Sequence, residues 1–122
     1  MNTAPIFAVC AADAAVIALL GAQPTRLYPF GEAPEGVIKP YAVWQLLTGS
    51  PDNYLSGRPD IDGYTLQVDV YATTAGDARA VTQAIARAIE LKANITRWGG
   101  ETKDTATKLY RSSFDIDWLV PR

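Results

Sequence analysis

The sequence alternates between apolar and polar residues over three segments, 41–47, 64–71 and 110–118. A period of two is typical of strands that have one face on a core, so each segment is predicted to be a β-strand. Shorter segments at 25–28 and 94–98 are also predicted as strands. In the most regular segment, the side chains expected to face the core are Tyr64, Leu66, Val68 and Val70.

Helical spacing of apolar residues begins near the N-terminus. Thr3 and Pro5 are predicted to start a helix there, through a side-chain cap and a proline in the first turn. Asp13 either lies on the surface of this helix or caps a second short helix over 14–20. Gly21 is predicted to end the helical region, because glycine adopts positive φ without a steric penalty.

A second helix is predicted after Thr74. The sequence Thr74 to Asp77 resembles a capping box, with Asp in place of the usual Glu, and helical spacing continues to about Leu91. The side chains expected to face the core from this helix are Val81, Ile85, Ala88 and Ile89.

Three segments are predicted to lack regular structure. Prolines and glycines over 21–40 exclude a long helix and a central strand, which leaves an ordered arm or edge segment. Turn-forming residues over 49–63 predict a long loop, and Gly99-Gly100 is predicted to be a hairpin turn. The exposed residues expected in the first of these segments are Phe30, Glu32 and Glu35.

The element order α-β-β-β-α-β-β predicts an α+β fold over a single domain, residues 1–122. We expect one mixed, mostly antiparallel β-sheet with two helical segments packed on one face. The alternation places Asp69, Asp115 and Asp117 on the other face, which would be open to water or to a partner.

Composition removes several classes of function. The chain of 122 residues has no histidine, which excludes Ser-His-Asp and Cys-His catalysis and most zinc sites. A net charge of −2 makes it a poor candidate for binding a phosphate backbone. The only cysteine, Cys10, cannot form an internal disulfide. Asp13 interrupts the apolar N-terminal run and no basic residue precedes it, so we expect an intracellular protein without a membrane anchor.

Candidate catalytic and metal-binding chemistry is weak. Asp60, Asp62, Gly63 and Asp69 match positions of a calcium-binding loop, but Arg58 stands where the first ligand should be. Asp and Gly that shape a loop before a strand explain this segment better. The carboxylates of the outer sheet face could form a hydrolytic pair, although solvated polar residues are expected there anyway. We therefore predict no enzyme, no catalytic or metal-ligating residue, and no cofactor.

Charge is distributed unevenly along the chain. Residues 1–91 carry five basic and nine acidic side chains, whereas residues 92–111 carry five basic and two acidic ones. A basic hairpin on an acidic body is expected when one copy docks head-to-tail on the next. A solvated hairpin that happens to collect lysines would give the same pattern, and charge alone leaves both interpretations open.

Several short segments, taken together in order, carry a family resemblance. These segments are Ala11 to Val16, Leu19 to Gly21, Arg26 to Pro29, Tyr41 to Gln45, Gly57 to Asp62, Leu66 to Tyr71 and Phe114 to Trp118. Through them the chain resembles the tail-completion (tail-terminator) proteins of long-tailed bacteriophages and prophages over nearly its whole length.

The resemblance implies a structural protein of the virion. Members of that family form rings, hexameric by resemblance, at the head-proximal end of the tail tube, where they stop tube polymerisation and present a surface to the head connector. The implied partners are further copies of the chain, the major tail tube protein and the head-tail connector proteins, with no membrane involved. Assembly would take place in the cytoplasm of the host bacterium. An acidic outer sheet face would let genome DNA pass through the ring without specific binding.

On this basis we expect the 49–63 loop and the 92–108 hairpin to supply contacts between subunits or with the tube. Arginines there would donate ion pairs, carboxylates would accept them, and a tryptophan would be an apolar anchor. The residues of this hypothesis are Arg58, Asp60, Asp62, Arg97, Trp98 and Lys103. Local explanations exist, since Asp60 could cap its own turn and Trp98 could complete the core.

Two other classes of function stay open. A sheet with exposed aromatic rings could bind single-stranded nucleic acid or act as another non-catalytic binding domain, although the acidic pI opposes nucleic-acid binding. A carboxylate-dependent metal enzyme is the remaining alternative.

Overall fold

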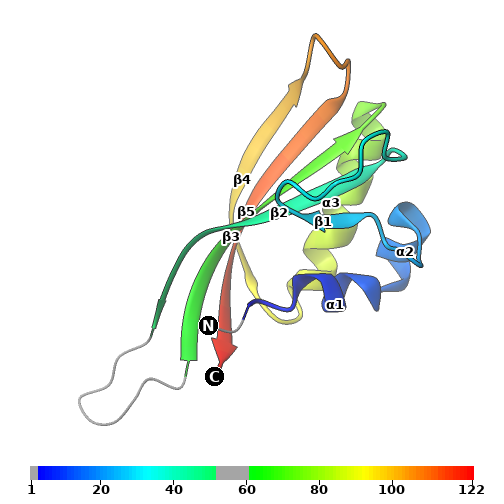
Figure 1. Ribbon diagram of the computed structural model, residues 1–122. Helices are drawn as coiled ribbons and strands as arrows, with labels where there is room; N and C mark the ends of the chain where they lie inside the picture. The colour runs from blue at the N-terminus through cyan, green and yellow to red at the C-terminus, as the bar shows by residue number, and fades with distance from the viewer. Residues whose placement is uncertain (1–2, 52–60) are drawn as a thin grey trace, which may run out of the picture.

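A computed structural model describes residues 3–51 and 61–122 of the chain. One five-stranded sheet is covered on one face by three helices within these residues (Figure 1). In chain order the elements are α1 (Ile6–Ala11), α2 (Ala14–Leu20), β1 (Leu27–Pro29), β2 (Tyr41–Pro51), β3 (Ile61–Ala72), α3 (Ala75–Ile89), β4 (Asn94–Lys103) and β5 (Tyr110–Pro121). The prediction of an α+β fold with this order of elements is confirmed.

The strands lie in the order β1-β2-β3-β5-β4. Only β1 and β2 pair in parallel, and the other neighbours are antiparallel. The two edges of the sheet are therefore β1, three residues long, and β4, ten residues long. A short edge strand next to a proline-rich segment is what the composition of residues 21–40 predicted.

The core lies between the helices and the inner face of the sheet. Every second residue of β3 from Asp62 to Ala72 is buried, which confirms the predicted face. Phe114 of β5 is the largest fully buried side chain of the core. Cys10 is fully buried in α1, and burial together with the nearby Asp13 raises the pKa of its thiol to about 12. The thiol therefore stays protonated at neutral pH.

The N-terminal caps of α2 and α3 agree with the prediction from sequence, whereas that of α1 does not. The side chain of Thr74 accepts a hydrogen bond from the backbone N–H of Asp77, so the predicted cap of α3 is confirmed. Asp13 caps α2 by accepting from the N–H groups of Ala15 and Val16, which selects the second of its two predicted roles. The predicted Thr3 cap is wrong, because Pro5 itself occupies the N-cap position of α1 and makes no side-chain cap hydrogen bond.

Strand pairing continues into two segments that the sequence predicted to be a loop and a turn. Residues 49–51 and 61–63 of the predicted 49–63 loop belong to β2 and β3, where Pro51 pairs with Asp62. Gly99-Gly100 is not a turn: β4 runs through it with a register shift, and Gly100 adopts φ +96°. The chain reverses instead at 104–109, where Lys108 N–H donates to the Asp104 carbonyl at 2.7 Å.

The sheet is longer than the layer of helices that covers it. In Figure 1 the β4–β5 hairpin extends past the helices at one end, and the paired ends of β2 and β3 extend past them at the other. From Trp98 to Lys103 every residue of β4 is exposed, as is β2 from Leu46 onward. No helix in the described part of the chain has the length and hydropathy that a bilayer span requires.

Candidate assembly surfaces

Trp98 lies on the open edge strand and is only partly supported by the core. Its ring contacts that of Phe114 on β5, with centroids 5.7 Å apart and planes tilted by 49°. The two residues are cross-strand partners, so Trp98 lies on the helix side of the sheet. It is nevertheless 62% exposed. Trp98 does not complete the core, and a large apolar surface stays available beside β4.

Arg97 precedes it and points to the opposite side. The Arg97 guanidinium lies 3.6 Å from the carboxylate of Asp115, its cross-strand partner on β5. The arginine side chain is mostly exposed, whereas Asp115 is largely covered. An exposed pair of this kind adds little to stability, so the guanidinium could be shared with another carboxylate at low cost.

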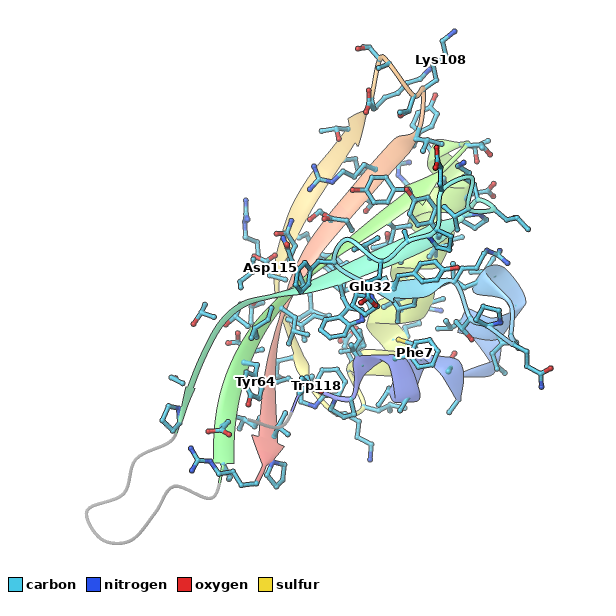
Figure 2. All side chains as sticks on the ribbon, viewed as in Figure 1. Phe7, Glu32, Tyr64, Lys108, Asp115 and Trp118 are labelled. Carbon is cyan, nitrogen blue, oxygen red and sulfur yellow. The ribbon has the colours of Figure 1, made fainter. Side chains whose placement is uncertain are left out.

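Lys103 and the turn that follows it form the end of the β4–β5 hairpin. The ammonium group of Lys103 lies 5.0 Å from the centre of the Tyr110 ring, which orients the side chain across the hairpin. Asp104 accepts a hydrogen bond from the N–H of Ala106 at 2.8 Å, and such backbone donors hold the pKa of its carboxyl below the usual value. The turn is thus fixed locally while Lys108 extends from its tip (Figure 2).

The β4 strand is tied to α3 close to the turn of the hairpin. Arg79 Nε and Nη2 donate to the two carboxylate oxygens of Glu101, two residues before the end of β4, at 2.7 and 3.0 Å. Such a two-point contact fixes the angle between the helix and the strand better than a single ion pair does. The hairpin is therefore supported at Glu101, although β4 is exposed from Trp98 to Lys103.

The outer face of the sheet is less acidic than the sequence suggested. Asp69, Asp115 and Asp117 do lie on this face, away from the helices, as Figure 2 shows for Asp115. Arg111 donates two hydrogen bonds to Asp69, the shorter of 2.9 Å, and Arg97 pairs with Asp115. The interpretation of an acidic face therefore needs correction, because two of its three carboxylates are neutralised by arginines from β4 and β5. Alternation along single strands could not show this, since it depends on cross-strand register.

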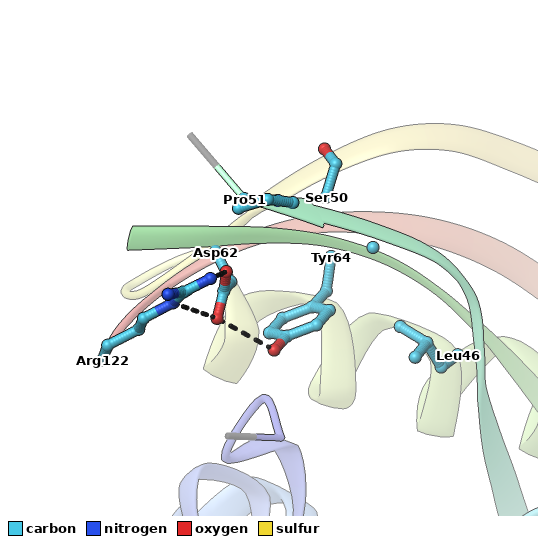
Figure 3. A pocket seen from close by; sticks show the side chains of 7 residues that line it. Leu46, Ser50, Pro51, Asp62, Tyr64 and Arg122 are labelled. Carbon is cyan, nitrogen blue, oxygen red and sulfur yellow. Dashed lines mark hydrogen bonds and ion pairs between the residues drawn. The ribbon is translucent and has the colours of Figure 1, made fainter. Parts of the chain in front are cut away.

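The carboxylate of Asp62 is bound by two other side chains of the same chain. Arg122 Nη2 donates to Asp62 Oδ1 at 3.0 Å, and the Tyr64 hydroxyl donates to Asp62 Oδ2 at 3.4 Å (Figure 3). The hydrogen bonds from Arg122 hold the pKa of the Asp62 carboxyl below its usual value. These side chains border an open hollow of about 690 Å³ at the end of β2 and β3, which Leu46, Gly49, Ser50 and Pro51 also line. Arg58 and Asp60 lie outside the described residues.

The segment between β1 and β2 forms a second exposed surface. We call residues 30–40 the arm. Phe30 and Ile38 are 67% and 69% exposed, and the carboxylates of Glu32 and Glu35 are also exposed. Within residues 3–51 and 61–122, neither carboxylate has an ion-pair partner. The sequence predicts that Phe30, Glu32 and Glu35 are exposed, but neither they nor Ile38 are among the contact residues that it predicts.

Metal-binding side chains are not clustered in the part of the chain that the structure describes: no three Asp, Glu, Cys or His residues there lie close enough to hold an ion. Asp62 and Asp69 of the calcium-loop alternative lie on the inner and outer faces of β3, and each carboxylate pairs with an arginine.

Comparison with known proteins agrees with the resemblance inferred from sequence. The fold is similar to that of a chain in the virion of a native gene transfer agent particle, with a TM-score of 0.70, 15% identity, and coverage of 96% of this chain and 92% of that one. A search of curated proteins finds no significant match. The family model for tail completion protein gp17 matches residues 4–121. The chain therefore belongs to the tail completion protein gp17 family and is a structural protein of the phage tail, located in the virion.

Proposed function

We propose that this protein forms a ring on the head-proximal end of the tail tube, where it ends tube polymerisation and joins the tail to the head connector. The ring would be hexameric, as the family resemblance implies. The observation that carries this proposal is the exposed Trp98 on the open edge of β4. A tryptophan that rests on a core residue yet stays accessible is the type of anchor that dominates protein interfaces.

The β4–β5 hairpin supplies three of the proposed contact residues. Arg97, Trp98 and Lys103 lie within one strand, and the tie between Arg79 and Glu101 holds that strand to the body. A rigid support lowers the entropy lost on docking, which favours a specific contact. Asp62 would act differently, since its carboxylate already binds Arg122. We propose that Asp62 belongs to a second contact surface, at the far end of β2 and β3. The contacts proposed for Arg58 and Asp60 rest on the family resemblance alone.

The genome would pass through the ring without specific binding. The outer sheet face carries arginines whose charges are balanced by Asp69 and Asp115. Neutralised arginines release few counterions from DNA, and this release drives most non-specific DNA binding. We propose that this face contributes to a smooth channel wall, because its two arginines are paired with carboxylates and the exposed Asp117 adds a further negative charge.

Electron microscopy of tail tubes tests the proposal. Tubes are grown from the major tail tube protein of the same phage or prophage, with and without this protein. We expect a ring of density at one tube end and tubes that stop growing after its addition. Trp98→Ala should reduce the fraction of capped ends, whereas Leu91→Ala, which removes an exposed apolar side chain just after α3, should not. Tubes with bare ends that keep growing would contradict the proposed function.

A further inference from the structure

The arm and the β4 edge lie at opposite edges of one sheet. The arm follows β1, which pairs only with β2 among the described residues, and β4 pairs only with β5. Surfaces at opposite edges cannot meet within one copy of the chain. They can meet between copies that repeat head-to-tail, and such contacts generate rings when the rotation closes.

Strand register places these two surfaces at the same level along the strands. A row of paired residues crosses the whole sheet from β1 to β4: Pro29, Trp44, Val68, Phe114 and Trp98. Phe30 directly follows Pro29, so an exposed phenylalanine and an exposed tryptophan stand at the two ends of one row. A neighbour placed edge to edge would bring the two rings together.

A second row of paired residues shows that the other end of the arm is also level with a residue of β4. Tyr41, Tyr71, Arg111 and Thr102 are paired across β2, β3, β5 and β4. The arm thus runs from the row that ends at Trp98 back to the row that ends at Thr102. The two ends of the arm therefore lie level with the two ends of the segment 98–102 on the opposite edge.

The charges of the two surfaces are complementary. Glu32 and Glu35 of the arm have no ion-pair partner among the described residues, and neither do Lys103 and Lys108 of the hairpin. Lys103 directly follows Thr102 of the second row, and Lys108 lies beyond it at the tip of the hairpin (Figure 2). Opposite charges beside apolar anchors favour one partner and one orientation.

From these observations we propose that the arm of one copy docks on the β4 edge of the next, with Phe30 against Trp98 and with Glu32 and Glu35 near Lys103 and Lys108. The partner is a second copy of this chain. The inference rests on the ring assembly proposed above and names the surfaces that join its subunits.

Cysteine cross-linking tests the contact directly. The double variant Glu35→Cys/Lys103→Cys keeps Phe30 and Trp98 and, mixed with tail tubes and then oxidised, should form a ladder of disulfide-linked chains. A matched control, Leu119→Cys/Lys103→Cys, carries two exposed cysteines but lacks the proposed contact, and it should form no ladder. Cys10 is fully buried and should not react in the folded protein.

A charge exchange provides a second measurement that keeps both aromatic side chains. Glu32→Lys/Glu35→Lys and Lys103→Glu/Lys108→Glu should each weaken assembly by about tenfold or more, through like-charge repulsion. All four substitutions together should restore it. If each pair weakens assembly and the combination does not recover, the proposed contact is wrong.

The outcomes separate this inference from the proposed function. Capped tubes without a cysteine ladder would overturn the contact and leave the capping function intact. If the double-cysteine variant forms the ladder but the tubes stay uncapped, the contact is supported and the capping function is contradicted. A ladder of equal intensity in the Leu119→Cys control would also overturn the contact, because the cross-links would then reflect random collisions.

Discussion

Asp62 on β3 and Arg122, 60 residues later, are joined by three hydrogen bonds that close the end of the sheet. These bonds hold the pKa of Asp62 below its ordinary value, so the ionised form stabilises the folded chain. That stabilisation is present above the unfolded pKa of about 3.9 and is lost as pH falls through the lower pKa of the folded state.

Asp62→Asn should therefore destabilise the protein at neutral pH but not in acid. At pH 7 the variant should unfold at a lower urea concentration than wild type, because the amide cannot form a charge-assisted bond with Arg122. At a pH below the folded pKa of Asp62 the two proteins should have similar stability, since both groups are then neutral. Urea titrations across this range provide the measurement, and a difference that stays constant with pH would contradict the assignment.

Gly49→Ala should destabilise the extended end of β2. A Cβ atom at Gly49 would lie 2.6 Å from Cδ1 of the Tyr64 ring, its cross-strand partner, and that ring is buried. Because the ring has little room to move, we expect a loss of about 1–3 kcal/mol in the free energy of unfolding.

Gly63→Ala is the matched control for this change. A Cβ atom there would meet its nearest neighbours at 3.6 and 3.7 Å, which are ordinary contacts. Its effect should stay within about 0.5 kcal/mol. Denaturant unfolding of the two variants tests the pair, and equal losses would show that the Tyr64 contact is not responsible.

Replacing the caps of the first two helices should have unequal effects. Asp13→Ala removes the acceptor for two backbone N–H groups of α2 and should cost about 0.5–2 kcal/mol. Thr3→Ala should be nearly neutral, because α1 has no side-chain cap hydrogen bond. Thermal unfolding of the two variants decides this, and a large loss for Thr3→Ala would restore the cap that the sequence suggested.

The structural features that the sequence did not predict have a common physical origin. Local patterns predicted β3 and the start of α3 well, because alternation and capping depend on residues close in the chain. The pairings that define the surfaces depend on distant residues: Asp69 with Arg111, and Phe30 at the end of the row of Trp98. Gly99-Gly100 resembled a turn because glycines favour turns, yet cross-strand pairing carried β4 through it with a bulge. Register depends on which strands pair, so the pattern within a single strand does not show which residues become cross-strand partners.

Single-stranded DNA should not bind appreciably to this protein at moderate salt. The rings of Tyr41 and Tyr71 are 5.1 Å apart and stacked, so each already covers one face of the other. The arginines of the outer face are paired with carboxylates, which weakens their attraction for phosphates. We expect no shift of a labelled oligonucleotide in a gel. Binding that falls steeply with added salt would favour the alternative of a nucleic-acid-binding domain.

Arg97→Glu should reduce assembly on tail tubes while leaving the monomer folded. The Arg97 guanidinium lies 3.6 Å from Asp115 and is largely exposed, so loss of the pair and the new repulsion between the introduced glutamate and Asp115 should together lower the free energy of unfolding by about 1–2 kcal/mol. At an interface the same change replaces a positive charge on β4 with a negative one and should weaken docking by about tenfold or more. Arg87→Glu makes the same change in net charge at an exposed position of α3 that has no ion-pair partner among the described residues, and it serves as the control. Counting capped tube ends by electron microscopy, with thermal unfolding in parallel, separates assembly from folding.

Equal capping by wild type and Arg97→Glu would remove Arg97 from the interface, whereas equal losses in Arg97→Glu and Arg87→Glu would point to net charge as the cause.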